Sequence, residues 1–191
     1  TARSLVLTVS TVDDFQDNGI TLNAEDELVV TVTGNTVTGA GELTYDDGDP
    51  AQNGIQVNGA DITGVIQDNT ISGIAYDNTN NPTKWVATSL LNFYSDVDIL
   101  DNDISQGHVG LYMYGATGDM VGNTLAIEKV GVASYGILFY NLDPTKADPA
   151  GRLAAVPAPV GIIGQAGPRG DKALLPILVD GNDVSLVGPD D

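Results

Sequence analysis

Apolar and polar residues alternate over short stretches along most of the chain. Gly19–Leu22 (Gly-Ile-Thr-Leu) places two apolar side chains two positions apart, which is the spacing of a β-strand with one buried face. No stretch has the 3.6-residue period of a substantial amphipathic helix. The pattern predicts short strands separated by turns. It returns in Gly54–Val57, Leu90–Phe93, Gly110–Met113 and Gly136–Phe139, and one predicted core row is Ile20, Ile55, Leu91, Leu111 and Ile137.

A second motif of seven residues alternates with these segments. It consists of an aliphatic residue, a variable residue, Gly or Asp, Asn, Thr or Asp, an aliphatic residue and a small residue. Asn tolerates left-handed backbone and bonds neighbouring backbone groups, so it suits a sharp bend. We expect the five Asn residues to stack, with their amides bonded along the stack. The copies are Val32–Thr38, Ile66–Ser72, Ile99–Ser105, Met120–Ala126 and Val179–Ser185, which contain Asn35, Asn69, Asn102, Asn123 and Asn182.

The spacing of the Asn motif indicates a parallel β-solenoid. Asn123 follows Asn102 by 21 residues, which is about one coil. The earlier copies are spaced more widely, and the surplus lies in the turn-like stretches 40–52 and 74–88. A solenoid accepts such insertions because they lie on its surface between fixed strands.

These two motifs resemble the repeat of the right-handed parallel β-helix family, which includes pectate-lyase-like enzymes and surface β-solenoid proteins. The resemblance covers Asp17–Tyr140 and resumes at Ile177. It implies an all-β, right-handed parallel β-helix (a single-stranded β-solenoid) of about five coils in residues 1–140. An extended arm or loop, 141–176, and a final partial coil with a tail, 177–191, would follow. The same coil carries enzymes and inert scaffolds, so the resemblance is weak evidence of function.

Charge and composition exclude several classes of function. The chain has 26 acidic and 7 basic residues and a net charge of -19, which disfavours nucleic-acid binding. It has no Cys and one His, so disulfides, thiol catalysis and His-rich zinc sites are excluded. No apolar run has the length of a membrane span, so we expect no membrane insertion. The Asp-rich composition fits a high-salt or calcium-rich environment, where counterions screen self-repulsion, and it fits an extracellular protein equally well. We expect an extracellular or cell-surface location, with the periplasm as an alternative.

Tyrosines form the most informative outward row. We expect Tyr94, Tyr114 and Tyr140 to stack in one row that follows the Gly-Ile strand, and Tyr112 to belong to the neighbouring outward row. Such an aromatic ladder can stack sugar rings or anchor a protein partner. Alternatively, tyrosine simply suits exposed strands and stacks on itself.

The resemblance to lyases and epimerases implies catalytic candidates. These enzymes pair acidic residues with a basic residue or a tyrosine, and several use calcium. The corresponding candidates are Asp96, Asp98, His108 and Tyr112, with Tyr114 beside them. No Lys or Arg that would neutralise a substrate carboxylate lies in the coils around His108. We therefore lean towards a non-catalytic chain, and enzymatic activity stays an alternative.

Calcium is the only cofactor that the residues suggest, and the chain is otherwise expected to need none. Asp68 and Asp101 precede two stacked Asn residues, so their carboxylates would repel each other unless a cation or proton intervened. Asp46, Asp47 and Asp49 form a second oxygen-rich group, whose spacing does not complete an EF-hand loop. Solvated carboxylates are the alternative interpretation of both groups.

The arm differs from the predicted coils. It holds six of the nine prolines and four of the seven basic residues, beside an acidic body. Its apolar residues favour docking on the chain's own coil or on a neighbouring subunit. The candidate interaction residues are Arg152, Leu153, Val156, Val160, Ile162, Ile163, Arg169 and Lys172.

The predicted coil ends carry no capping helix, and exposed solenoid ends invite strand pairing. Either the chain is an ordered section of a longer protein, or another subunit covers the ends. The first hypothesis is therefore a non-catalytic extracellular structural or assembly module that interacts through its arm, coil ends and Tyr face. Its partners would be other proteins or further copies of the chain. The alternative hypothesis is a carbohydrate-active domain, namely a polysaccharide lyase, an epimerase or a glycan-binding module.

Overall fold

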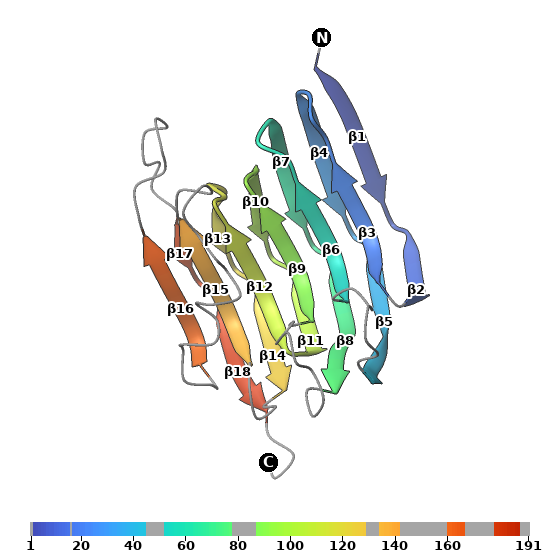
Figure 1. Cartoon of the computed structure of the whole chain (residues 1–191), viewed down its shortest axis with the longest axis vertical. Helices are drawn as coiled ribbons and strands as arrows, with labels where there is room; N and C mark the ends of the chain where they lie inside the picture. Colours follow the sequence, from blue (N-terminus) through green and yellow to red (C-terminus); the bar gives the residue numbers. More distant parts are fainter. Residues whose placement is uncertain are drawn as a thin grey trace.

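The chain folds into a parallel β-helix, as the repeat predicts (Figure 1). The computed structural model describes residues 2–15, 17–44, 52–77, 87–128, 134–141, 160–166 and 178–187. These residues form eighteen strands and no helix, and none of them provides a helix that could cross a membrane. Five complete coils are followed by a sixth layer of strands.

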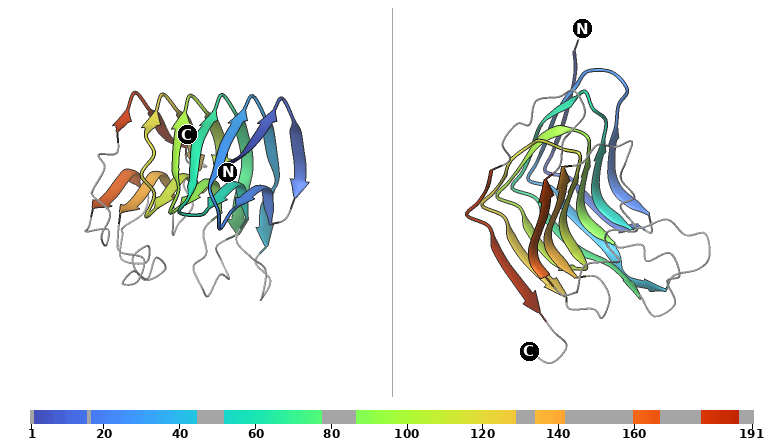
Figure 2. Two further views of the ribbon diagram at one scale, coloured as in Figure 1. Left: turned by 90° about the horizontal axis from the view of Figure 1, so that it is seen from above. Right: turned by 60° about the vertical axis from the view of Figure 1, so that its left-hand side comes forward.

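The strands form three six-stranded sheets in which all neighbours are parallel. Figure 2 shows the sheets along and across the stack. Sheet A contains β1 (Arg3–Thr8), β4 (Leu28–Thr33), β7 (Ile62–Gln67), β10 (Asp96–Leu100), β13 (Met120–Val121) and β17 (Val179–Asp180). Sheet B contains β2 (Thr11–Phe15), β5 (Thr36–Thr44), β8 (Thr70–Asp77), β11 (Asp103–Gly107), β14 (Thr124–Glu128) and β18 (Asp183–Val187). Sheet C contains β3 (Asn18–Asn23), β6 (Asn53–Asn58), β9 (Thr88–Phe93), β12 (Val109–Tyr114), β15 (Tyr135–Asn141) and β16 (Val160–Ala166).

The sixth layer has an altered chain order. After β15 the next described strand is β16, which pairs with β15 in sheet C before the chain reaches β17 in sheet A. Val160, Ile162 and Ile163, which the sequence assigns to an arm, therefore lie in a strand of the β-helix. The other candidate arm residues, Arg152, Leu153, Val156, Arg169 and Lys172, lie outside the described residues.

Aliphatic side chains from all three sheets fill the interior. Val32, Ile66 and Ile99 stack in sheet A, and Ile71 and Ile104 stack in sheet B, all with no exposed surface. Burial of apolar surface at about 25 cal/mol per Å² makes these rows the main stabilising contribution. The inward row of sheet C is Ile20, Ile55, Leu90, Leu111 and Ile137.

This row corrects the sequence prediction by one residue. Leu90, not Leu91, is aligned with Ile55 and Leu111, whereas Leu91 is aligned with Gln56 and Tyr112. Because successive side chains of a strand point to opposite faces, a one-residue shift moves Leu91 to the outer face. The two adjacent leucines made the register ambiguous, since both satisfy the apolar pattern.

The Asn residues form the predicted ladder at the corner between sheets A and B, which we call the asparagine corner. The Oδ1 atom of Asn102 accepts hydrogen bonds from the backbone N and Nδ2 of Asn69, at 3.1 and 2.9 Å. The corresponding atoms of Asn102 donate to Oδ1 of Asn123, at 3.0 and 2.9 Å. Nδ2 of Asn102 also donates to the carbonyl of Ile66 in the preceding coil. The pattern joins Asn35, Asn69, Asn102, Asn123 and Asn182.

Candidate functional site

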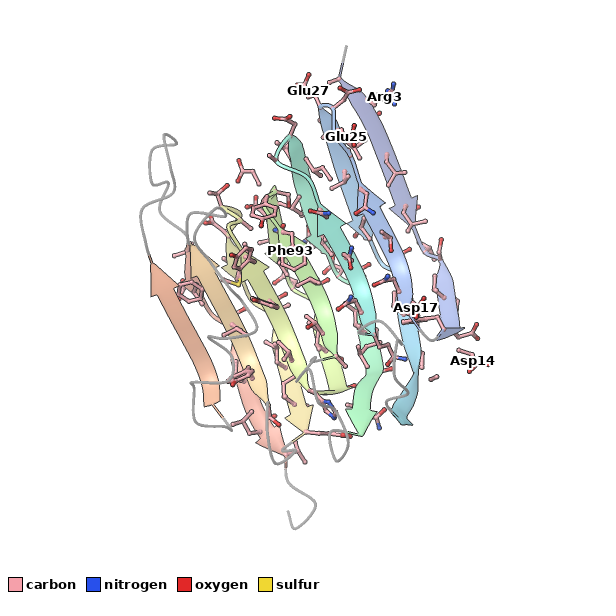
Figure 3. The ribbon with its side chains drawn as sticks, in the orientation of Figure 1. Arg3, Asp14, Asp17, Glu25, Glu27 and Phe93 are labelled. Carbon is pink, nitrogen blue, oxygen red and sulfur yellow. The ribbon has the colours of Figure 1, made fainter. Side chains whose placement is uncertain are left out.

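The outer face of sheet C changes character along the stack. In the first two coils it carries Thr21 and Asn58, which are exposed, and Gln56. From the third coil onward the same rows carry apolar and aromatic side chains. They are Leu91, Phe93, Tyr112, Tyr114 and Leu138, and Figure 3 labels Phe93. This region coincides with the Tyr face that the sequence predicts.

The structure corrects both the register and the exposure of that face. Tyr114 is aligned with Phe93 on one side and with Tyr140 on the other, so Phe93 occupies the place expected for Tyr94. Tyr112 and Tyr114 are only 4% and 2% exposed, whereas the sequence predicts an open ladder. They pack instead of presenting their faces to solvent.

Most of the described ring pairs contact edge to face, whereas Phe93 and Tyr94 are stacked. Phe93 lies 5.7 Å from Tyr114 and 6.1 Å from Tyr112 between ring centroids, and Tyr94 lies 5.6 Å from Tyr114. This geometry is favourable because the positive edge of one ring meets the negative face of the next. Phe93 and Tyr94 stay half-buried. The part of the cluster that reaches solvent is therefore at Phe93 and Tyr94.

Tyr94 has an unusual backbone conformation. Its φ of 62° is left-handed, and it follows Phe93 where the chain turns from sheet C to sheet A. The aligned positions of the neighbouring coils are Gly59 and Gly115, with φ of 158° and 59°. A bulky side chain in this conformation costs about 1 kcal/mol or more. Tyr94 is thus a strained residue at a position that its neighbours fill with glycine.

The acidic candidates Asp96 and Asp98 both bond the next coil. Oδ1 of Asp96 accepts a hydrogen bond from the Thr117 hydroxyl, at 2.9 Å, and Oδ1 of Asp98 accepts one from the backbone N of Asp119, also at 2.9 Å. Asp119 repeats the arrangement, because its Oδ1 accepts from the backbone N of Leu178 at 2.8 Å. Asp98 and Asp119 thus satisfy backbone N–H groups where sheet A begins, and Asp96 binds a side-chain hydroxyl, roles that their alternation with apolar residues did not indicate.

His108 lies apart from these carboxylates. It is the one residue between β11 and β12, whereas Asp96 and Asp98 follow the far end of the parallel strand β9. The five residue steps from Val109 to Tyr114 span about 17 Å. His108 is fully buried, and desolvation lowers its pKa from 6.5 to about 4, so its imidazole is neutral at pH 7. The structure therefore does not bring the four catalytic candidates together, although Tyr112 lies in the strand that His108 precedes.

The carboxylates proposed for calcium have a conformational role. Asp68 and Asp101 have φ of 55° and 52°, in a left-handed row that contains Val9 in the first coil and glycine in the others. Gly122 leaves room for Asp101, because a Cβ there would lie 2.2 Å from its Oδ1. The described residues contain no group of three or more His, Asp or Glu that could hold a metal. Asp46, Asp47 and Asp49 lie outside the described residues.

Comparison with protein-family models, curated proteins and solved structures gave no match.

Proposed function

We propose that this chain is a non-catalytic structural or assembly module, with an extracellular or cell-surface location. The kinship with the right-handed parallel β-helix family that its repeat suggests is part of the same proposal. The observation that supports it is the exposure of Leu5, Val6 and Val9, which lie on or directly after β1, a strand that is paired on one side only among the described residues. Unpaired strand edges with apolar side chains favour association with another β-structure.

The bonding of the candidate side chains supports a structural role over a catalytic one. Asp96 and Asp98 accept hydrogen bonds from the next coil, and His108 is buried about a strand's length away from them. General acid–base catalysis needs such groups within hydrogen-bond reach of one reacting centre. The carboxylates instead hold neighbouring coils together, as a rigid scaffold requires.

The first experiment measures self-association. Light scattering coupled to size exclusion is recorded over a wide range of protein concentration, in low and high salt. An assembly module of this kind forms oligomers or filaments that grow with concentration. A chain that stays monomeric throughout contradicts self-assembly.

A glycan-binding module is the second candidate, and the strained Tyr94 favours it. Backbone strain is often retained where a side chain must be presented to a ligand. Tyr94 is half-buried beside Phe93, and the exposed Asp96 lies two residues further along the chain. An aromatic ring with a nearby carboxylate suits the apolar face and the hydroxyls of a sugar.

Tyr94→Gly separates this role from a purely structural one. The variant places glycine at the position where the adjacent coils have Gly59 and Gly115, so the fold should be retained. Binding to acidic and neutral polysaccharides is measured by affinity electrophoresis, with Asn58→Ala as a matched surface control. Loss of retention in Tyr94→Gly alone supports glycan binding. Absence of retention in the wild type removes this candidate.

A further inference from the structure

The outer face of sheet A is exposed to solvent within the stack. Strands β4 and β7 each pair with a strand on both sides, and Val29 in β4 is nevertheless 40% exposed. Its neighbours Val30 and Val32 are fully buried. Because successive side chains of a strand alternate, Val29, Thr31 and Thr33 point outward. The exposure of this face therefore follows from the direction of its side chains and not from the position of the strands in the stack.

Nine aligned outward positions in the first three coils carry no charge, and we call them the uncharged face. Three of them are valines, and the others are Ser, Thr or Gln. The chain has 26 acidic residues and a net charge of -19, so a block of this size without a carboxylate is the surface on which desolvation costs least. The positions are Ser4, Val6 and Thr8 in β1, Val29, Thr31 and Thr33 in β4, and Thr63, Val65 and Gln67 in β7.

Acidic residues surround the uncharged face on three sides, and we call them the acidic rim. Figure 3 shows Glu25 and Glu27 at the start of β4, beside Arg3, which is the one basic residue among the described residues. An exposed apolar patch with a polar rim is typical of a protein interaction site. The rim consists of Glu25, Asp26, Glu27 and Asp61 before β4 and β7, Asp68 after β7, and Asp96 and Asp98 in β10.

The other two sheets do not present a comparable face. The apolar outer side chains of sheet C are already covered, since Tyr112 is 4% exposed and Leu138 has no exposed surface. In sheet B the outward positions after the asparagine corner hold no aliphatic side chain in the first three coils. They are Thr11, Asp13, Thr36, Thr38, Thr70 and Ser72. In the described part of these coils, exposed valines without a neighbouring carboxylate on the same face occur on sheet A.

We propose that the uncharged face docks on the face of a β-sheet in another protein, whose centre carries apolar or hydroxyl side chains and whose rim carries Lys or Arg. This proposal rests on the proposed assembly function and names the chemistry of its partner. Two sheets pack face to face about 10 Å apart with their side chains interdigitated, which suits the short side chains of Val29, Thr31 and Val65. Basic residues at the margin of the partner then meet the acidic rim. A second copy is the wrong match, because its rim carries the same negative charge.

The size of the uncharged face indicates a weak contact that depends on charge. Three strands of six residues, about 4.8 Å apart and rising about 3.3 Å per residue, cover roughly 300 Å². A standard stable interface covers about 800 Å² on each partner. Attraction between the two rims therefore has to add to the apolar contact, and the affinity should fall as salt screens that attraction.

A charge-reversed copy of the same chain serves as the probe, because it keeps the uncharged face and carries a basic rim. The probe contains Glu25→Lys, Glu27→Lys and Asp61→Lys, all at exposed positions before β4 and β7. A milder probe contains only the first two substitutions, and circular dichroism checks that both probes keep the β-structure of the unchanged chain. Binding of each labelled probe to the unchanged chain is measured by sedimentation velocity with fluorescence detection.

The triple variant should bind the unchanged chain about tenfold more tightly than the unchanged chain binds itself at about 0.05 M salt. The milder probe should lie between the two. Both preferences should disappear at about 0.5 M salt, where charges are screened within a few ångströms.

Val29→Gln in the unchanged chain locates the contact. The substitution places a longer polar side chain at an exposed position of the uncharged face without changing the charge. Thr36→Gln is the matched control, since it lies at an exposed position of the same coil on sheet B. Val29→Gln should weaken binding of the triple variant about fivefold or more, whereas Thr36→Gln should leave it unchanged.

The outcomes separate this inference from the function on which it rests. Binding of the probe that is lost in high salt and in Val29→Gln supports the inference. Binding that Val29→Gln and Thr36→Gln affect equally overturns it, because the contact then lies elsewhere. Self-association as tight as binding of the probe, and weakened by Val29→Gln, makes a second copy the occupant and also overturns it. If no probe binds but light scattering shows oligomers, the inference fails and the assembly function stands. If neither is seen, both fail.

Discussion

Two corners of the coil turn the chain from one sheet to the next with different residues. At the asparagine corner Asn recurs in five of the six layers, and each Asn before Asn182 donates to the Oδ1 atom of the next one. At the corner between sheets B and C, which we call the loop corner, the aligned positions are Gln52, Ala87, His108 and Ser134. The connections there also vary in length, from one residue at His108 to longer stretches in other coils. Residue type is therefore nearly constant at the asparagine corner, whereas both residue type and connection length vary at the loop corner.

This difference between the corners indicates which residues contribute most to the stability of the coil. An Asn side chain that bonds two neighbouring coils is buried and cannot be replaced without leaving backbone groups unpaired. At the loop corner the buried polar residues differ in type and in bonding. Gln52, for example, donates its amide to the carbonyl of Phe15 and accepts from the backbone N of Ala75. Substitution of any Asn at the asparagine corner should therefore cause a large and similar loss in the free energy of unfolding. At the loop corner the loss should differ from one position to the next.

Asn102→Leu should have the largest effect. It removes the acceptor of the Asn69 backbone N and the donor to the Ile66 carbonyl, both of which are buried. Leaving two buried groups unpaired costs about 3 kcal/mol. Urea denaturation followed by circular dichroism measures the free energy of unfolding, and Thr124→Leu on the exposed face of sheet B serves as the control. An unfolding midpoint equal to that of the wild type would contradict the role of the ladder.

Protonation of His108 provides a comparable effect at the loop corner. Burial lowers the pKa of His108 to about 4, whereas in the unfolded chain it stays near 6.5. The unfolded state therefore binds the extra proton first, so stability is unaffected above pH 6.5 and falls between pH 6.5 and pH 4. The loss attributable to His108 approaches about 3 kcal/mol at pH 4.

His108→Gln isolates this contribution from that of the carboxylates, which titrate over part of the same range. The free energy of unfolding is measured for both proteins from pH 7 to pH 4.5. The wild type should lose more stability than the variant as the pH falls. If the wild type and His108→Gln differ in free energy of unfolding by the same amount at every pH, His108 is not buried in its neutral form.

The two corners also differ in how well they could be predicted. The β-helix and the Asn stack follow from the sequence because one residue type recurs at a fixed place between apolar positions. Leu7–Asp13 occupies the place of a sixth copy but does not match the motif, because Val9 and Ser10 stand where the other copies have Gly or Asp and Asn. Beyond the loop corner the prediction placed Leu91 in the core row, which is wrong, because connections of unequal length do not fix the register and Leu90 and Leu91 both satisfy the apolar pattern. The burial of Tyr112 could not be predicted, because alternation shows which side chains share a face but not what covers that face.

Gly54→Ala tests the packing of the loop corner. A Cβ at Gly54 would lie 2.5 Å from the Ser89 carbonyl oxygen and 2.8 Å from Ile71 Cγ2, closer than real contacts allow. The backbone must shift, and we expect a loss of about 2 kcal/mol in the free energy of unfolding. Ser89→Ala, in the aligned position of the next coil, is the matched control. The buried Ser89 hydroxyl lacks a hydrogen-bond partner among the described residues, so this variant should be neutral or slightly stabilising. Equal losses in the free energy of unfolding in Gly54→Ala and Ser89→Ala would contradict the close packing at Gly54.

The smallest effect is expected at the asparagine corner and has the opposite sign. Val9 has a φ of 48°, which is unfavourable for a β-branched residue, while the aligned positions are Gly34, Asp68 and Asp101. Its side chain is 86% exposed, so replacing it removes little packing. Val9→Asn should raise the free energy of unfolding by about 1 kcal/mol, because Asn tolerates left-handed backbone. Val6→Asn, exposed within strand β1 without positive φ, should give no such gain. Thermal melts of both variants at a protein concentration where the chain is monomeric measure the effect. An equal shift of the melting temperature in both variants would mean that removal of an exposed apolar side chain, and not relief of backbone strain, causes the effect.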